Sequence, residues 1–95
     1  MKIIVEGTEY EIIKDDYSIF DETEFKELYT DYFNKFDYIA GDYSYNKLRL
    51  KGFYDNKNKN VKPINNIKLL DNYLKEQCAY GCKYFVIKKT HNIVK

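Results

Sequence analysis

CKYFVIKK, residues 82–89, is the stretch that most clearly indicates how the sheet is built. Its centre, Phe85-Val86-Ile87, is apolar at three consecutive positions. Successive side chains of a β-strand point to opposite faces of the sheet, so this strand is apolar on both faces. That pattern favours a position in the middle of the sheet.

The N-terminal half of the chain predicts a hairpin followed by a helix. Residues 2–14 contain two β-branched or aromatic runs separated by a turn at Gly7, which is typical of a β-hairpin. Asp21 is a good helix N-cap, and an apolar stripe then runs at helical spacing from Phe25 to Phe36. We expect one amphipathic helix whose aromatic side chains pack in the core.

The next segment predicts a second hairpin and a second helix. Residues 37–40 and 48–54 indicate strands, joined through residues 41–46 by a turn whose exact position the sequence leaves open. A helix begins at about Asn66 and ends before Gly81. Its expected buried stripe consists of Ile67, Leu70, Leu74 and Cys78.

The predicted order of elements is β-β-α-β-β-α-β. We therefore expect the α+β class, with a mixed or antiparallel sheet of about five strands and two helices covering one face. Residues 1–95 should form a single domain, with residues 91–95 as a flexible tail.

Composition excludes several classes of protein. No apolar run reaches the roughly 18 residues that a membrane-spanning helix needs, so no membrane contact is expected. The N-terminus, MKIIVEGTEYEII, lacks the apolar stretch of a signal peptide. We expect a cytoplasmic protein.

Charge is distributed unevenly along the chain. Residues 1–42 carry 4 Lys and 12 acids, for a net charge of −8, whereas residues 43–95 carry 11 Lys and Arg49 against 3 acids, for a net charge of +9. The asymmetry favours either an anionic partner for the basic half or attraction between the two halves within the fold. Arg49 is the single arginine, and its planar guanidinium has a fork of donors that lysine lacks.

The best candidate for a binding surface is a register of alternate residues in GDYSYNKLRLKGFY, residues 41–54. This basic, aromatic-flanked register consists of Tyr43, Tyr45, Lys47, Arg49, Lys51 and Phe53. Lysine and arginine can contact phosphates while aromatic rings stack on bases. The same alternation is also typical of the solvated face of a half-buried strand, with Arg49 in a structural ion pair.

Cys78 and Cys82 form a C-x3-C pair. It could be a buried structural pair, a reversible disulfide acting as a thiol switch, or part of a metal site. Structural zinc takes four ligands, and two cysteines with His91 are one short, so we expect no metal. The sequence contains no evident nucleophile–base pair and no phosphate-binding glycine loop, so we expect a non-enzymatic protein with no cofactor and no small-molecule substrate.

Two segments together resemble the YutD-like family of small bacterial proteins. They are FDYIAGDYSYNKLRLKGFY (residues 36–54) and LDNYLKEQCAYGCKYFVIKK (residues 70–89). The chain departs from the family pattern at Tyr43-Ser44, where relatives are expected to carry Trp-Gly. The resemblance implies cytoplasmic, single-domain proteins, and it implies no particular activity, substrate or cofactor.

Three functional hypotheses follow from the sequence. The first is a binding module that contacts RNA or a ribonucleoprotein through the basic register. The second is a protein–protein interaction module that uses exposed tyrosines, because the chain holds 11 Tyr and 6 Phe in 95 residues. The third is a thiol redox switch at Cys78 and Cys82.

Overall fold

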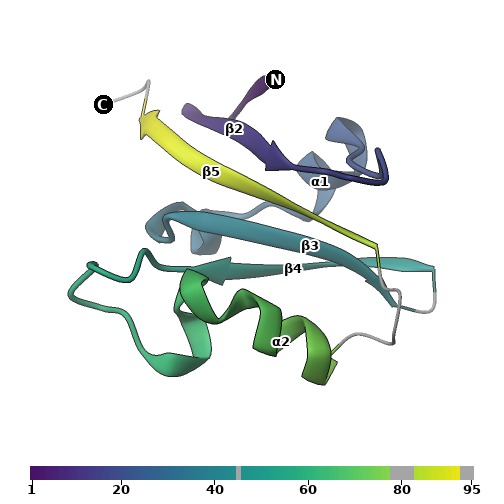
Figure 1. The fold of residues 1–95 in the computed structure, drawn as a ribbon. Helices are drawn as coiled ribbons and strands as arrows, with labels where there is room; N and C mark the ends of the chain where they lie inside the picture. Colours follow the sequence, from purple (N-terminus) through teal and green to yellow (C-terminus); the bar gives the residue numbers. More distant parts are fainter. Residues whose placement is uncertain (45, 78–82, 93–95) are drawn as a thin grey trace.

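The computed structural model describes residues 1–44, 46–77 and 83–92. Five strands form one antiparallel sheet in the spatial order β1-β2-β5-β3-β4 (Figure 1). They are β1 (Lys2–Val5), β2 (Thr8–Lys14), β3 (Tyr38–Ser44), β4 (Lys47–Phe53) and β5 (Tyr84–Asn92). The predicted α+β class and element order are confirmed, and so is the central position of the strand that contains Phe85-Val86-Ile87.

The C-terminal strand joins two hairpins whose strands are not neighbours in the described sheet. β5 pairs with β2 on one side and with β3 on the other. It extends to Asn92, where it pairs with Thr8, so His91 and Asn92 belong to a strand and not to the expected tail. Residues 93–95 lie outside the described residues.

The first helix is shorter than its apolar spacing predicted. α1 (Glu22–Leu28) begins at Asp21, whose side chain accepts a hydrogen bond from the backbone N–H of Glu24. It ends at Tyr29, which is extended, and a separate 3₁₀ helix, η1 (Asp31–Lys35), follows. The prediction of one continuous helix was wrong: Tyr29 and Thr30 are both extended, and they separate the two apolar groups into two short helices.

The second helical region forms in three short pieces. Two 3₁₀ turns, η2 (Pro63–Asn65) and η3 (Ile67–Leu69), lead into α2 (Leu70–Gln77). Ile67 and Leu70 pack on the sheet as the predicted stripe requires, and so does Tyr73, which lies beside that stripe. Leu74 is half-buried, and Cys78 lies outside the described residues. Within the part of the chain that the structure describes, no helix is long and apolar enough to cross a membrane.

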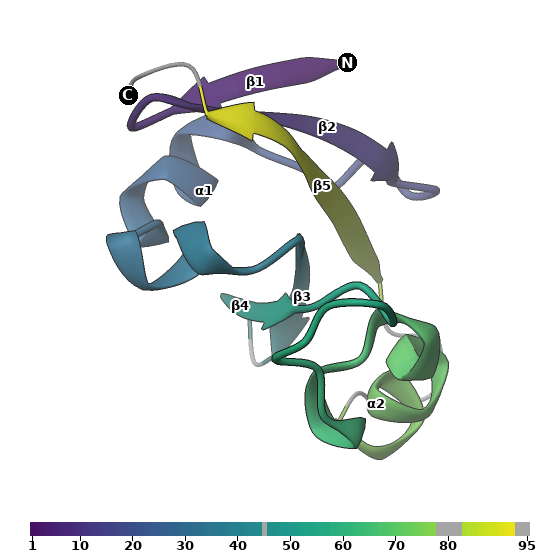
Figure 2. The same ribbon diagram turned by 90° about the vertical axis from the view of Figure 1, so that its left-hand side faces the viewer.

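The helices α1 and α2 lie on opposite faces of the sheet. α1 lies behind the sheet in Figure 1 and α2 in front of it, and the rotated view in Figure 2 agrees. The expectation that both cover one face was wrong. Neighbouring residues of the central strands supply both layers: Ile87 faces the α1 side and Val86 the α2 side.

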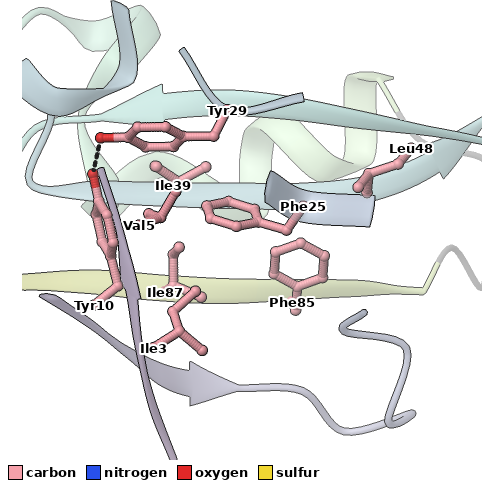
Figure 3. Close-up of a cluster of buried hydrophobic side chains, with 9 residues drawn as sticks. All are labelled: Ile3, Val5, Tyr10, Phe25, Tyr29, Ile39, Leu48, Phe85 and Ile87. Carbon is pink, nitrogen blue, oxygen red and sulfur yellow. Dashed lines mark hydrogen bonds between the residues drawn. The ribbon is translucent and has the colours of Figure 1, made fainter. Parts of the chain in front are cut away.

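The larger hydrophobic core lies between the sheet and α1. Figure 3 shows its aromatic centre, where the rings of Tyr10 and Phe25 are fully buried and Phe85, which belongs to β5, lies below Phe25. The hydroxyl groups of Tyr10 and Tyr29 are hydrogen-bonded to each other at 2.8 Å. Burial raises the pKa of Tyr10, and this hydrogen bond raises it further, so the hydroxyl stays neutral.

The core on the α2 face is smaller. Its buried residues are Ala40, Phe53 and Val86, and the ring of Tyr73 packs edge-on against that of Phe53 at 5.5 Å between centroids. This face also carries the charged residues of β4. The α1 face therefore holds most of the buried apolar volume, and the α2 face combines apolar contacts with charge.

Candidate functional site

The β3–β4 hairpin determines which residues of the predicted register lie together. β3 runs through Gly41 and Asp42 to Ser44, so these residues lie within a strand and do not end it as the sequence suggested. Ser44 pairs with Lys47, so the hairpin turns between these two residues. Asn46 has φ 64°, the left-handed conformation that is common in short hairpin turns. Tyr45 lies outside the described residues.

The structure separates the tyrosine of the predicted register from its cations. Tyr43 pairs with Leu48, so both side chains lie on the α1 face. There the Tyr43 hydroxyl donates a hydrogen bond to the Glu24 carboxylate, which raises the pKa of Tyr43 to about 12. Four of the predicted residues share the α2 face of β4: Lys47, Arg49, Lys51 and Phe53.

Phe53 is not available for stacking on a ligand. It is 1% exposed and packs in the core beneath Tyr73. The Lys51 ammonium lies over both rings, 5.3 Å from the centroid of Phe53 and 5.7 Å from that of Tyr73. Burial raises the pKa of Tyr73, and the nearby Asp42 carboxylate raises it further. Lys51 is thus held by cation–π contacts at the surface of this core.

Arg49 forms an ion pair with the acidic half of the chain, one of the two interpretations that the sequence left open. Its Nε and Nη2 atoms donate to the two carboxylate oxygens of Asp42, at 3.1 and 2.7 Å. Asp42 is buried in β3, directly opposite Arg49. The hydrogen bond to Asp42 raises the pKa of Arg49. Two parallel bonds of this kind hold the guanidinium in one orientation.

A pocket of about 480 Å³ opens at the outer edge of β4. Its floor is the backbone of β4 around Leu50 and Gly52. Aromatic residues of η1 form one wall, and η2 with α2 forms the other. The lining residues are Tyr32, Phe33, Phe36, Arg49, Leu50, Lys51, Gly52, Ile64, Asn65 and Tyr73.

Apolar side chains at the pocket remain open to solvent. Tyr32 is 58% exposed and Ile64 is 72% exposed. Phe36 is buried because its ring lies directly on Gly52, where an added Cβ atom would come within 2.0 Å of Phe36 Cδ2. Large exposed apolar side chains on both walls of one pocket are typical of a binding site.

Lysines rim this pocket. The Lys35 ammonium lies 4.5 Å from the centroid of Tyr32, and Lys51 lies over Tyr73 on the opposite wall. Among the described residues, none of the four ion pairs involves Lys35, Lys47 or Lys51. The rim is therefore positive, and its ammonium groups are available to a carboxylate or phosphate.

The sequence analysis selected β4, the strand that lines this pocket, but it did not predict the residues of η1 and η2 that form the pocket walls. The apolar spacing predicts that Tyr32 and Phe36 belong to a buried helical stripe, and it makes no prediction for Ile64. Their approach to β4 depends on the break after α1 and on η2, and no local pattern signals these features. The high number of tyrosines was the one indication that aromatic side chains would remain at the surface.

The structure does not test the cysteine hypothesis. Cys78 and Cys82 lie outside the described residues. Within residues 1–44, 46–77 and 83–92, no three His, Cys, Asp or Glu side chains gather as a metal site would require. The thiol switch stays a prediction from the sequence.

This architecture is a small α+β domain with a pocket at the edge of an antiparallel sheet. Residues 4–88 match the YutD-like family, described as "Putative antitoxin YutD-like". The chain belongs to the YutD-like family, as the two sequence segments indicated.

Two comparisons with YutD of Bacillus subtilis, one of sequence and one of structure, support this assignment. The chain is 42% identical over 87 residues to "Putative antitoxin YutD" of strain 168, which covers 92% of this chain and 96% of that protein. It is also similar to the solution NMR structure of protein yutD from B. subtilis. That match has a TM-score of 0.81 at 39% identity and covers 100% of this chain and 86% of the solved one.

Proposed function

We propose that this protein is a protein-binding module whose partner docks in the pocket at the outer edge of β4. The observation that carries the proposal is the exposure of Tyr32 and Ile64 on opposite walls of one pocket with a positive rim. A B. subtilis relative has the name "Putative antitoxin YutD", and the word antitoxin implies a counterpart to be neutralised. Direct binding of a protein partner is consistent with that description.

The arrangement of charge and rings supports a protein partner over RNA. The RNA hypothesis combined stacking rings with phosphate contacts on one strand face. In the structure Phe53 is buried, Tyr43 faces the other side of the sheet and Arg49 is bonded to Asp42. Among the described residues of the predicted register, Lys47 and Lys51 would remain as phosphate contacts, and the ring next to Lys51, Phe53, is buried. RNA binding is therefore an outcome that the experiment below must exclude.

The test is affinity capture from native lysate, with and without RNase, followed by measurement of affinity with the purified partner. Ile64→Asp places a charge in the pocket at an exposed position, so the fold should be unaffected. Ile4→Asp is the matched control, since Ile4 is 54% exposed on β1 at the opposite edge of the sheet. We expect Ile64→Asp to weaken binding by about tenfold or more, as expected for a central interface residue, while Ile4→Asp leaves it unchanged.

Two results would contradict the proposal. If the captured material disappears on RNase treatment, and Lys47→Glu/Lys51→Glu abolishes its capture in the absence of RNase, the partner is RNA. If binding survives Ile64→Asp and is lost in Ile4→Asp, the interface lies at the β1 edge. Arg49→Glu is unsuitable for this test, because it would place a second carboxylate beside the buried Asp42.

A further inference from the structure

Within the part of the chain that the structure describes, the outer edge of β4 presents backbone groups that no other strand of the sheet pairs with. In an antiparallel ladder, alternate residues direct their N–H and C=O groups toward the same neighbour. Tyr54, just past the end of β4, directs both groups away from β3: its N–H donates to Asn65 O at 2.7 Å, and its carbonyl accepts from Ile67 N–H at 3.0 Å. By alternation, the backbone groups of Gly52, Leu50 and Leu48 point outward as well.

The chain itself already uses this edge for strand pairing, but only at its end. Tyr54 and Asn66 form an isolated bridge in parallel orientation. The chain then departs into η2, and the pocket begins at Asn65 and Ile64, beside Gly52 and Leu50. An edge strand with open ladder positions is a template for another chain. The pocket therefore begins where the protein's own edge pairing stops.

The pocket walls suit the side chains of an extended segment. Residues of an added strand alternate between the two faces of the sheet. On one face they would meet Tyr32 and Phe36, and on the other Ile64 and Tyr73. Such side-chain pockets on both sides of a free edge are the arrangement used when a peptide is bound by strand addition.

Charge indicates which segment fits. Lys47, Arg49 and Lys51 lie on β4, and Lys35 lies on the η1 wall. A second copy of the chain paired through β4 would bring these cations against their own equivalents. A segment with Asp or Glu side chains would instead be attracted to the rim.

We propose that β4 binds an extended, acidic segment of a protein partner, which adds to the sheet as a sixth strand beside Leu48, Leu50 and Gly52. This inference rests on the proposed function and specifies the binding mode. The backbone of β4 supplies the hydrogen bonds, the two walls take alternate side chains, and Lys51 with Lys35 selects for carboxylates.

The probe is a library of seven-residue peptides displayed on phage and selected on the wild-type protein. Enriched sequences should alternate apolar residues with Asp or Glu. Lys51→Glu should weaken an enriched synthetic peptide by about tenfold or more, because it places a carboxylate at the rim. Lys88→Glu is the matched control: Lys88 also lies over a ring on the α2 face, 5.9 Å from the centroid of Tyr38, but on the central strand β5.

Backbone amide exchange distinguishes strand addition from other modes of binding. In the free protein, the outward amides of Leu48, Leu50 and Gly52 should exchange faster than the inward amides of Arg49 and Lys51. Saturation with an enriched peptide should protect the three outward amides at least tenfold.

The other possible results distinguish strand addition, the acidic character of the segment and the identity of the partner. If the peptide or the captured partner binds and is sensitive to Ile64→Asp, but the outward amides stay unprotected, strand addition is wrong and the proposed function stands. If selection enriches no sequence, or enriches basic ones, the acidic extended segment is wrong. A dimer that protects the same amides without peptide would assign the edge to a second copy of the chain.

Discussion

The two faces of the sheet differ in composition: the α1 face is a large aromatic core, and the α2 face combines a small core with charged side chains. The α1 face buries large rings from three regions of the chain: Tyr10 in β2, Phe25 in α1 and Phe85 in β5. The α2 face buries fewer side chains and holds the Asp42–Arg49 ion pair and the Lys51 ammonium. β4 serves both faces, because alternate residues point in opposite directions. Stability and binding can therefore be changed separately by mutating neighbouring positions.

The largest expected effect on stability comes from substitutions at two adjacent residues of β5 that face opposite sides of the sheet. Phe85→Ala should lower the free energy of unfolding by about 3–5 kcal/mol, since it empties a site in the aromatic core. Its ring contacts those of Phe20 and Phe25, at centroid distances of 5.0 and 6.5 Å. Val86→Ala on the opposite face should cost about 1–2 kcal/mol, because it removes two methyl groups. Urea denaturation followed by circular dichroism measures the free energy of unfolding of both variants. Equal losses would contradict the conclusion that the α1 face holds the larger core.

Overpacking the α1 face should have the next largest effect. A Cβ atom at Gly41 would lie 2.2 Å from Phe85 Cζ, so Gly41→Ala forces the ring to move. We expect a loss of about 1–3 kcal/mol. The double variant Gly41→Ala/Phe85→Leu should cost less than the sum of the two single variants, because the smaller side chain makes room for the methyl group. Additive costs would show that the ring is not the obstacle.

On the α2 face, removal of the Asp42–Arg49 ion pair should lower the free energy of unfolding by less than the changes to the α1 core. Arg49→Met removes the bidentate partner of the buried Asp42 carboxylate and should cost about 1–2 kcal/mol, a value reduced because Arg49 is partly exposed. Lys47→Met is the control on the same face of β4, and it should stay within about 0.5 kcal/mol of wild type. Thermal unfolding of the two variants measures this difference. Equal stability would show that the pair adds nothing.

The smallest effect concerns Tyr43 on the α1 side. Its hydrogen bond to Glu24 raises its pKa to about 12, above the usual value of about 10. A raised pKa means that the fold favours the neutral phenol, so its contribution to stability is complete below pH 10 and is lost as the pH rises through 12. Carbon-13 NMR titration of labelled tyrosine should show Glu24→Gln lowering the pKa of Tyr43. An unchanged pKa would place the cause elsewhere.

Local patterns predicted the elements better than their arrangement in space. The apolar triplet of β5 was enough to identify the central strand, because its pattern depends only on neighbouring residues. The break after Leu28 was missed because the apolar spacing continues from α1 into η1. The opposite placement of α1 and α2 depends on how the two hairpins dock onto β5, which no single segment encodes.

The prediction that Tyr43 shares a face with the cations of β4 was wrong, because it continued the alternation of side chains through the turn as if the chain were one straight strand. Across a two-residue turn, the residue opposite Tyr43 is Leu48, so Tyr43 shares a face with the even-numbered residues of β4. Lys47, Arg49 and Lys51 were correctly grouped because they lie on one continuous strand. The pocket walls come from distant segments, and their contacts appear only when the chain is folded.

The central position of β5 has a consequence for synthesis of the protein. Each hairpin can close as soon as its own residues have emerged, but in the described sheet the two are joined only through Tyr84–Asn92. The sheet that supports the β4 edge therefore forms only after this strand has been synthesised. A chain interrupted before residue 84 would lack the strand that buries both hairpins, and it would be a substrate for proteolysis before it could hold a partner.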